Sequence, residues 1–279
     1  MHATNHMAHV TTRDHTRLNV KDWGTGRPVI LLHGWPLSAD SWDDQAMALA
    51  EAGLRAIAYD RRGFGRSSQP WSGYDYDTLA DDLAAVIDAT GARDATLVGF
   101  SMGGGEVARY MSRHGGKHVA QAVLVSAVVP RLLKTPDNPD GVDQSALDQM
   151  TAGLKQDRAH FFAGFFTAFF GEGSPGKPVS LELLDWARDV AMMASLKATL
   201  ACAHAFATTD FRTDMGAFHV PTLVIHGTND KTVPIDATGR VSARMIAQAQ
   251  LIEYDGAPHG LFATHKERLT QDLLTFLGR

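Results

Sequence analysis

The 279-residue sequence contains a single cysteine, Cys202, and this scarcity limits how the chain can be stabilised. One thiol cannot form a disulfide within the chain, so the fold must depend on a packed core and is compatible with a reducing compartment. Cys202 lies in an alanine-rich pattern of helical type. We therefore interpret it as a small packed residue rather than as a nucleophile.

Long apolar runs and an excess of basic residues are also missing. The chain has no stretch of 18 consecutive apolar residues and no apolar signal core near its start. Its formal net charge is −5, and no basic stripe is visible. We expect no membrane partner and no nucleic-acid partner, and we predict a cytoplasmic protein.

Patterns that bind metals or phosphates are absent as well. No H-E-x-x-H motif occurs, and the histidines lack the spacing of metal ligands. The Gly/Arg loop at 60–67 matches neither a P-loop nor a dinucleotide-binding loop, so we interpret its charges as braces of the fold. Residues 1–10 are interpreted as a disordered N-terminus or a remnant of recombinant expression, although His2, His6, His9 and His15 admit a metal site. No cofactor and no metal are expected.

What the sequence does contain is an alternation of strand and helix patterns, with 44% hydrophobic and 20% charged residues. Alternating polarity predicts an edge hairpin at 11–23. Continuous apolar runs predict buried strands at 28–32, 54–59, 96–100, 121–128, 221–225 and 250–254. Helical spacing predicts helices at 41–53, 76–90, 235–247 and 264–277, and another after residue 103. The sequence therefore predicts an α/β fold with a mostly parallel central sheet flanked by helices.

Two of the predicted helices allow specific expectations. In the helix at 41–53, Trp42, Met47, Leu49 and Ala50 are placed toward the core. The helix at 76–90 has apolar residues at three- and four-residue spacing, which defines its buried face. Gly91 is expected to cap the C-terminus of that second helix.

Residues 130–215 interrupt the alternation of strands and helices. The segment opens with a Pro/Gly loop and continues with helical patterns that include six phenylalanines and no strand pattern. We interpret it as a helical lid inserted into a core made of residues 11–129 and 216–279. The phenylalanines are expected in the core. The alternative is that a few of them line a substrate pocket, because ligand sites are mostly apolar.

A predicted strand, a tight turn and a predicted helix meet at Ser101. The pattern Gly99-x-Ser101-x-Gly103 places this serine at the apex of the turn, as in a nucleophile elbow. Such a residue has a strained backbone, so its close neighbours must be small, and the helix directs its first N–H groups at the reaction centre. The alternative is an N-cap serine after a glycine turn, because short Gly/Ser patterns also occur by chance.

Three candidate catalytic residues follow predicted strands in the chain order Ser101, Asp230, His259. Ligands of such sheets bind beyond the carboxyl ends of the strands, so we expect these side chains to meet there. His259 is expected to remove the Ser101 proton and deliver it to the leaving group, while Asp230 orients the imidazole and stabilises imidazolium. The backbone N–H groups of Trp35 and Met102 are the expected oxyanion hole.

Other acidic residues and histidines compete for these roles. Asp255 is too near His259 along the chain to approach its ring easily, and Asp236 is expected at a helix start, where it caps N–H groups. His226 and His33 flank strand ends and are interpreted as structural, with His33 bonded to the backbone near the oxyanion loop.

Several stretches of the chain carry a family resemblance. They are His33-Gly34-Trp35-Pro36, residues 59–67 (Tyr-Asp-Arg-Arg-Gly-Phe-Gly-Arg-Ser), residues 99–106 (Gly-Phe-Ser-Met-Gly-Gly-Gly-Glu), residues 133–139 (Leu-Lys-Thr-Pro-Asp-Asn-Pro) and residues 255–260 (Asp-Gly-Ala-Pro-His-Gly). With these stretches the chain resembles the α/β-hydrolase superfamily, and more narrowly the cofactor-free (non-haem) chloroperoxidase and aryl esterase group. The resemblance runs from about residue 14 to the C-terminus.

This resemblance implies a serine esterase that acts on small acyl esters through an acyl-enzyme. Enzymes of the group can also act as perhydrolases, in which hydrogen peroxide replaces water and converts an ester or carboxylic acid into a peracid. The peracid oxidises halide in solution, so the resemblance implies no haem and no metal. Members often assemble as symmetric oligomers, so it also allows a homo-oligomer.

Other functions remain open on the same fold. The triad also suits a lactonase or a hydrolase of carbon–carbon bonds. Epoxide hydrolases and haloalkane dehalogenases of this fold use an aspartate nucleophile, so Ser101 argues against both. A ligand-binding receptor is a further alternative, because fold alone does not establish function, and hydrolysis of a p-nitrophenyl ester distinguishes it from an enzyme.

Overall fold

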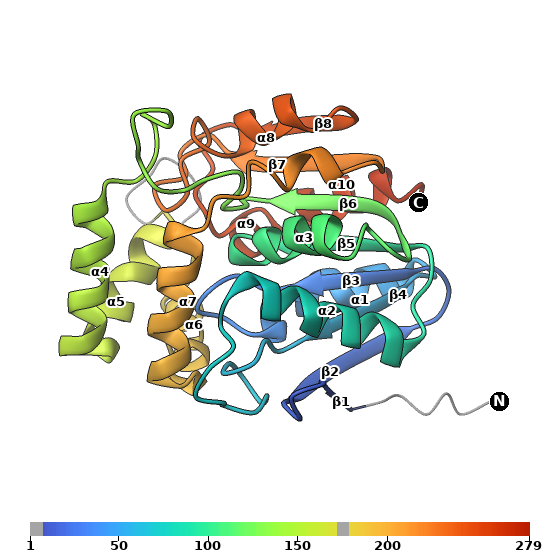
Figure 1. The fold of residues 1–279 in the computed structure, drawn as a ribbon, viewed down its shortest axis with the longest axis horizontal. Coiled ribbons are helices and arrows are strands. Elements are labelled where there is room, and N and C mark those ends of the chain that lie inside the picture. Colours follow the sequence, from blue (N-terminus) through green and yellow to red (C-terminus); the bar gives the residue numbers. More distant parts are fainter. Residues whose placement is uncertain (1–7, 172–178) are drawn as a thin grey trace.

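A computed structural model describes residues 8–171 and 179–279 of the chain. Within these residues, eight strands form one sheet in the order β1-β2-β4-β3-β5-β6-β7-β8 (Figure 1). Strands β3 to β8 are parallel, and β1 and β2 add an antiparallel edge. The bounds of the strands are β1 (His9–Thr11), β2 (Arg17–Gly24), β3 (Pro28–Leu32), β4 (Arg55–Tyr59), β5 (Ala95–Phe100), β6 (Val119–Val125), β7 (Thr222–Gly227) and β8 (Ala249–Tyr254). The predicted mostly parallel sheet is confirmed.

Helices cover both faces of this sheet. Every residue of β3, β5 and β7 is buried, because helices pack on both sides of these apolar strands. Helices α2 (Tyr76–Thr90) and α3 (Met102–Arg113) lie on one face, and α1 (Asp43–Glu51) and α10 (Lys266–Phe276) lie on the other (Figure 1). The shorter elements are η1 (Ala39–Trp42), η2 (Met215–Ala217), α8 (Gly239–Met245) and α9 (Leu261–Thr264).

Helix α2 has the bounds that its spacing predicts. The side chain of Asp75 accepts a hydrogen bond from the N–H of Thr78 at 2.9 Å, which satisfies a free donor at the start of the helix. At the other end, Gly91 adopts a φ of 64°, the left-handed conformation that ends helices and that glycine adopts readily. The predicted C-cap is therefore confirmed.

The helix predicted at 41–53 buries Trp42 and Leu49 as predicted, leaves Ala50 half-buried and exposes Met47. It divides into η1 and α1, and Met47 is 53% exposed, whereas Gln45 and Ala46 are buried. Gln45 is tolerated inside because its side-chain amide donates a hydrogen bond to the carbonyl of Phe262 at 3.2 Å. The prediction that Met47 faces the core is wrong, because apolar spacing alone does not fix which face of this short helix meets the sheet.

Four predicted boundaries also need correction. The edge hairpin begins at His9 rather than residue 11, because Val10 is buried and pairs with Leu18, so the predicted disordered N-terminus does not extend to residue 10. Residues 1–7, with His2 and His6, lie outside the described residues. Strand β6 ends at Val125 rather than at residue 128, because the chain leaves the extended conformation at Ser126, whose φ is 45°. The helices predicted at 235–247 and 264–277 are shortened to α8 and α10 by turns that precede them.

Four of the described helices lie between β6 and β7 and sit beyond the carboxyl ends of the strands (Figure 1). They are α4 (Gln144–Gln156), α5 (Arg158–Phe169), α6 (Leu181–Met193) and α7 (Leu196–Thr208). Most of the clustered phenylalanines are buried, namely Phe162, Phe166, Phe169 and Phe170. The segment interpreted as a lid thus lies against the strand ends where the candidate catalytic residues are expected.

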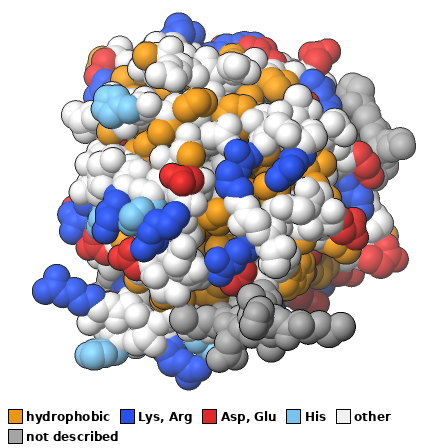
Figure 2. Space-filling view, turned by 90° about the vertical axis from the view of Figure 1, so that its right-hand side faces the viewer, with side chains coloured by type: hydrophobic (Ala, Val, Ile, Leu, Met, Phe, Trp, Pro, Cys, Tyr) orange, Lys and Arg blue, Asp and Glu red, His pale blue; other side chains and the backbone are white. Residues whose placement is uncertain are grey.

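The face at the amino ends of the strands has a mixed surface. Figure 2 shows basic and acidic side chains there, interspersed with small apolar areas. In the part of the chain that the structure describes, no single helix is long and apolar enough to cross a membrane. Helices α6 and α7 meet that test only as a pair, and the pair is bent by 101°.

Candidate active site

Ser101 lies at a sharp turn between β5 and α3. Its φ of 53° and ψ of −117° are unusual for a residue with a side chain. A Cβ atom on Gly99 would lie 2.6 Å from the carbonyl oxygen of Gly103, and one on Gly103 would lie 2.5 Å from that of Leu32. Only glycine fits at these two positions, so the turn has the close packing that the Gly-x-Ser-x-Gly spacing predicts.

The structure brings together the three residues that follow β5, β7 and β8. His259 Nε2 lies 2.9 Å from Ser101 Oγ, and His259 Nδ1 lies 2.6 Å from Asp230 Oδ2. All three residues are buried. Because the carboxylate only accepts hydrogen bonds, Nδ1 carries the proton and Nε2 is free to accept one from the serine hydroxyl. This arrangement allows proton transfer between serine and histidine.

The carboxylate of Asp230 is held by four groups. Its Oδ1 accepts hydrogen bonds from the N–H groups of Thr232 at 2.9 Å and Val233 at 2.8 Å. Its Oδ2 faces His259 and also His226, whose Nε2 lies 3.3 Å away. Burial alone would raise the pKa of Asp230, but the two histidines bring that pKa far below its ordinary value. The group is therefore an anion that can stabilise a charged imidazole.

His259 is enclosed by aromatic rings. The ring centroid of Phe100 lies 5.0 Å from that of His259, and the centroid of Phe169 lies 4.8 Å away. Helix α5 thus supplies part of the wall around the imidazole. The carbonyl of Phe169 also accepts a hydrogen bond from the N–H of Gly260 at 2.9 Å. These contacts restrict water around the histidine and fix the loop that bears it.

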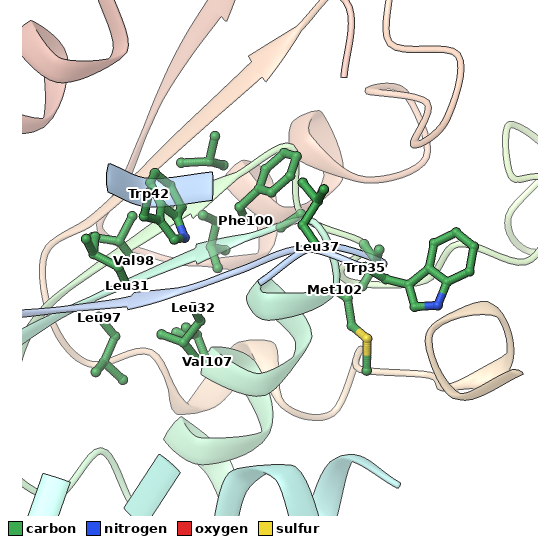
Figure 3. Close-up of a cluster of buried hydrophobic side chains, with 14 of the residues drawn as sticks. Leu31, Leu32, Trp35, Leu37, Trp42, Leu97, Val98, Phe100, Met102 and Val107 are labelled. Atoms are coloured by element: carbon green, nitrogen blue, oxygen red, sulfur yellow. The ribbon is translucent and has the colours of Figure 1, made fainter. Parts of the chain in front are cut away.

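Trp35 and Met102, the predicted oxyanion residues, both lie beside Ser101. A Cβ atom on Gly34 would lie 3.0 Å from Ser101 Cβ, so the backbone just before Trp35 packs directly against the serine. Met102 is the first residue of α3, where N–H groups have no acceptor within the helix. Figure 3 shows Trp35 beyond the end of β3 and Met102 at the start of α3. These two backbone N–H groups are thus available next to the serine.

The indole of Trp35 connects this loop to the helical segment. Its Nε1 donates a hydrogen bond to the carbonyl of Thr199 in α7 at 3.0 Å. The ring packs edge-on against Phe165 of α5 and Phe206 of α7, with centroids 5.4 and 5.5 Å apart. Because buried indoles are well ordered when the N–H is paired, the segment and the loop support each other.

A buried polar network beneath the loop includes a residue that the sequence analysis did not assign, Glu106. The guanidinium of Arg61 pairs with the carboxylate of Glu106 and donates to the carbonyl of His33 at 2.6 Å. Tyr59 adds a hydrogen bond to Glu106 at 2.9 Å. The ring of His33 also bonds to the backbone near the oxyanion loop, as predicted: Nδ1 donates to the carbonyl of Gly34 at 2.9 Å, and Nε2 accepts from the N–H of Arg61 at 3.0 Å. The sequence contains a signal that could have identified this pair. Glu106 is an acidic residue at an otherwise apolar and glycine-rich helix start, and Arg61 follows a predicted buried strand.

A cavity of about 220 Å³ opens onto Ser101. Its wall comes from the oxyanion loop, the loop after β6, helices α4, α5 and α7, and the loop after Asp230. The lining residues are Trp35, Ser101, Val128, Leu132, Val142, Ala146, Leu147, Met150, Phe165, Ala168, Phe206, Lys231, Thr232 and Val233. Of the clustered phenylalanines, Phe165 lines this cavity. The space suits a small, mostly apolar group.

The competing acidic residues lie in other environments. Asp255 is exposed and accepts a hydrogen bond from the hydroxyl of Thr228 at 3.3 Å. Asp236 pairs with Arg240 at 2.6 Å in a turn before α8, so the expected helix-capping role for Asp236 is wrong. Among residues 8–171 and 179–279, no group of three or more His, Cys, Asp or Glu side chains is arranged to hold a metal ion.

Comparisons with known proteins agree with this architecture. The profile of the alpha/beta hydrolase fold family matches residues 27–266. The chain is 45% identical over 271 residues to the non-heme chloroperoxidase CPO-A1 of Kitasatospora aureofaciens, which covers 96% of this chain and 98% of that protein. It is 42% identical over 275 residues to the bifunctional esterase/perhydrolase DCH of Acinetobacter calcoaceticus, covering 97% of this chain and 99% of that protein.

A solved structure shows the same similarity in three dimensions. The bromoperoxidase from Bacillus anthracis superposes with a TM-score of 0.94 at 44% identity, covering 98% of this chain and 99% of that one. Sequence and fold thus match along nearly the whole length of these enzymes. The chain belongs to the α/β-hydrolase family, within its group of non-haem chloroperoxidases and esterase/perhydrolases.

Proposed function

We propose that this enzyme is a serine esterase that cleaves small acyl esters through an acyl-enzyme on Ser101. The single observation that supports it most is the position of His259, bonded at once to Ser101 Oγ and to Asp230. A helix N-cap serine, the alternative for the Gly-x-Ser-x-Gly pattern, does not need that contact. The side chain of Ser101 also makes no capping hydrogen bond to α3.

The proposed reaction begins with attack of Ser101 Oγ on the ester carbonyl while His259 Nε2 takes the hydroxyl proton. The N–H groups of Trp35 and Met102 stabilise the oxyanion that forms. His259 then gives the proton to the leaving alcohol, and the acyl group remains on Ser101. Asp230 stays ionised throughout and keeps Nε2 directed at the serine.

Deacylation repeats these steps with a second nucleophile. Water attacks the acyl-enzyme with His259 as general base and releases the carboxylic acid. Hydrogen peroxide in place of water releases a peracid, and the peracid oxidises halide in solution while it returns to the carboxylic acid. The names of the relatives, non-heme chloroperoxidase and esterase/perhydrolase, support this second route. In this scheme the protein binds the acyl donor and the nucleophile, and needs no cofactor.

The proposal gives residues 130–215 the role of a lid over the core of residues 11–129 and 216–279. It is supported by the cavity wall, to which α4, α5 and α7 contribute, and by the contacts of Phe169 with the histidine loop. The lid role, the cytoplasmic location and the homo-oligomer remain predictions.

Hydrolysis of p-nitrophenyl acetate by the wild type, by Ser101→Ala and by Ser72→Ala tests the proposal. Ser72 is exposed and outside the cavity, so its variant controls for the substitution itself. The same three proteins are then given acetate, hydrogen peroxide and bromide, and halogenation is followed. We expect Ser101→Ala to lose both activities by several orders of magnitude and Ser72→Ala to keep both.

Two results would contradict parts of the proposal. Halogenation that persists without esterase activity in Ser101→Ala would exclude the peracid route through this serine. A wild type that fails to hydrolyse p-nitrophenyl acetate would contradict the esterase proposal and favour a lactonase or a ligand-binding receptor.

A further inference from the structure

The cavity above Ser101 has one charged residue in its wall among the described residues, Lys231. This lysine directly follows Asp230, and its side chain has no ion pair and no hydrogen bond within the described chain. It is exposed, whereas Ser101 is buried. The cavity therefore has a reactive hydroxyl at its inner end and an unpaired cation toward solvent.

Two carboxylates of the described chain, one adjacent to Lys231 in the sequence and one next to a residue of the cavity wall, have other partners. Asp230 is bonded to His259, to His226 and to the backbone N–H groups of Thr232 and Val233. Asp143, which precedes α4 near the cavity, pairs with Lys134 at 3.2 Å. Neither carboxylate neutralises the ammonium group, so Lys231 keeps the capacity to bind an anion.

The apolar character of the remaining wall determines where an anionic group of a substrate can bind. Between Ser101 and Lys231 the lining consists mainly of aliphatic and aromatic side chains, among them Leu132, Leu147 and Phe165. Burying a carboxylate among them without a partner is strongly unfavourable. A substrate with one ester and one carboxylate would therefore place its ester carbonyl at Ser101 and its carboxylate at the open end, beside the ammonium.

We propose that Lys231 makes this enzyme accept acyl esters that carry a second, anionic group, such as monoesters of short dicarboxylic acids. The inference rests on the proposed esterase function and names a substrate class for the same site. The methylene chain of the acyl group packs against the apolar wall, and the terminal carboxylate pairs with Lys231. The lysine contributes to substrate binding and takes no part in bond breaking.

The test compares two esters that differ in charge and match in shape. Monomethyl glutarate carries a terminal carboxylate, and methyl 5-methylhexanoate carries an isopropyl group in the same place. The quantity measured is the ratio of their kcat/KM values. The rates are obtained by titrating the acid that hydrolysis releases. The proteins are the wild type, Lys231→Met, Lys231→Glu and Lys231→Arg. Lys117→Met serves as the control, because Lys117 is exposed and absent from the cavity wall.

We expect Lys231→Met to lower the ratio about two- to fivefold, the upper part of the range of an exposed ion pair. Lys231→Glu should lower it further, and Lys231→Arg should restore most of it. The effect should appear in KM for the anionic ester, leave the neutral ester unchanged, and weaken in about 1 M salt. Lys117→Met changes the net charge equally and should leave the ratio unaltered.

The failure of this inference is distinguishable from the failure of the esterase proposal. If the wild type hydrolyses p-nitrophenyl acetate but the ratio is the same in Lys231→Met, the assignment of Lys231 is overturned and the esterase stands. The same holds if the wild type does not turn over the monoester at all. If p-nitrophenyl acetate is not hydrolysed, both fail.

Discussion

His33 Nδ1 donates a hydrogen bond to the carbonyl oxygen of Gly34 at 2.9 Å. That carbonyl belongs to the peptide unit whose N–H is that of Trp35, and in a planar trans peptide the two groups point in opposite directions. The N–H of Leu37 donates a second hydrogen bond to the same oxygen at 3.0 Å. The backbone N–H of Arg61 donates to His33 Nε2 at 3.0 Å, which orients the imidazole ring. Fixing the carbonyl therefore fixes the N–H that we place in the oxyanion hole.

Replacing His33 should reduce the rate of the chemical step. His33→Leu removes the donor to Gly34, so we expect kcat to fall about ten- to a hundredfold, less than the loss of a whole oxyanion donor. His33→Asn keeps an N–H near the position of Nδ1 and should recover part of the loss. Affinity for a trifluoromethyl ketone inhibitor should fall in parallel with kcat, while KM changes little. A leucine variant with normal kcat would contradict the positioning role.

The same histidine should make stability depend on pH. Burial, together with the positive charge of Arg61, lowers the pKa of His33 well below 6.5, so the folded protein holds the ring neutral. In the unfolded chain His33 binds a proton near pH 6.5, whereas in the folded chain it stays neutral at that pH. The unfolded state therefore binds more protons, so the free energy of unfolding must fall as pH drops below 6.5. The slope contributed by this one group is at most about 1.4 kcal/mol per pH unit.

Urea denaturation between about pH 5 and 7 measures this slope. We expect His33→Asn to show a shallower decline than the wild type across that range. His160→Gln, which replaces an exposed histidine, should keep the wild-type decline. Equal slopes in the wild type and His33→Asn would assign the acid sensitivity to other groups.

Asp230→Asn should impair catalysis while Asp255→Asn should not. The amide cannot hold Nδ1–H as the carboxylate does, and in a measured protease triad the corresponding change lowers kcat about 10⁴-fold. Asp255 lies on the same loop as His259 but is exposed and bonded to Thr228. Initial rates of p-nitrophenyl acetate hydrolysis test the pair. A severe loss in Asp255→Asn with an active Asp230→Asn would reverse the assignment.

Gly103→Ala and Gly164→Ala should change stability in opposite directions. A Cβ on Gly103 meets the carbonyl oxygen of Leu32 at 2.5 Å, so α3 must move away from β3, at a cost of about 1–3 kcal/mol. A Cβ on Gly164, inside α5, meets nothing within 4 Å, and alanine there should stabilise by about 0.5–1 kcal/mol. Free energies of unfolding in urea measure both. A Gly103→Ala protein as stable as the wild type would contradict the close packing at the elbow.

Much of the architecture follows from local patterns in the sequence. The apolar runs of β3, β5 and β7 predict strands buried on both faces, because only a sheet covered by helices on both sides can bury every residue of a strand. The glycines at 99 and 103 predict the elbow, because a Cβ there collides with backbone. The chain order Ser101, Asp230, His259 at strand ends predicts their meeting. Each of these inferences needs only nearby residues and the rule that parallel strands end at one edge.

Other features depend on contacts between distant segments. Periodicity placed Met47 inside, but the docking of α1 on the sheet exposes it and buries Gln45, whose amide meets a carbonyl 217 residues away. The pairing of Arg61 with Glu106 below His33 joins two loops and a helix start that no local pattern connects. Composition predicts an apolar pocket, but only packing decides that Phe165 faces it.

The chemistry of the site divides in the same way. The sequence indicates which residue types can take part in catalysis. A serine in an elbow, an acidic residue and a histidine, each at a strand end, together are typical of a catalytic triad. The tertiary structure decides that Asp230 rather than Asp255 faces His259 and that His226 shares the same carboxylate. It also places Lys231 in the cavity wall with no ion pair to any residue of the ranges 8–171 and 179–279. The reason is physical: residue type and local spacing set what a side chain can do, whereas burial, hydrogen bonding and charge depend on neighbours that only the folded chain brings within a few ångströms.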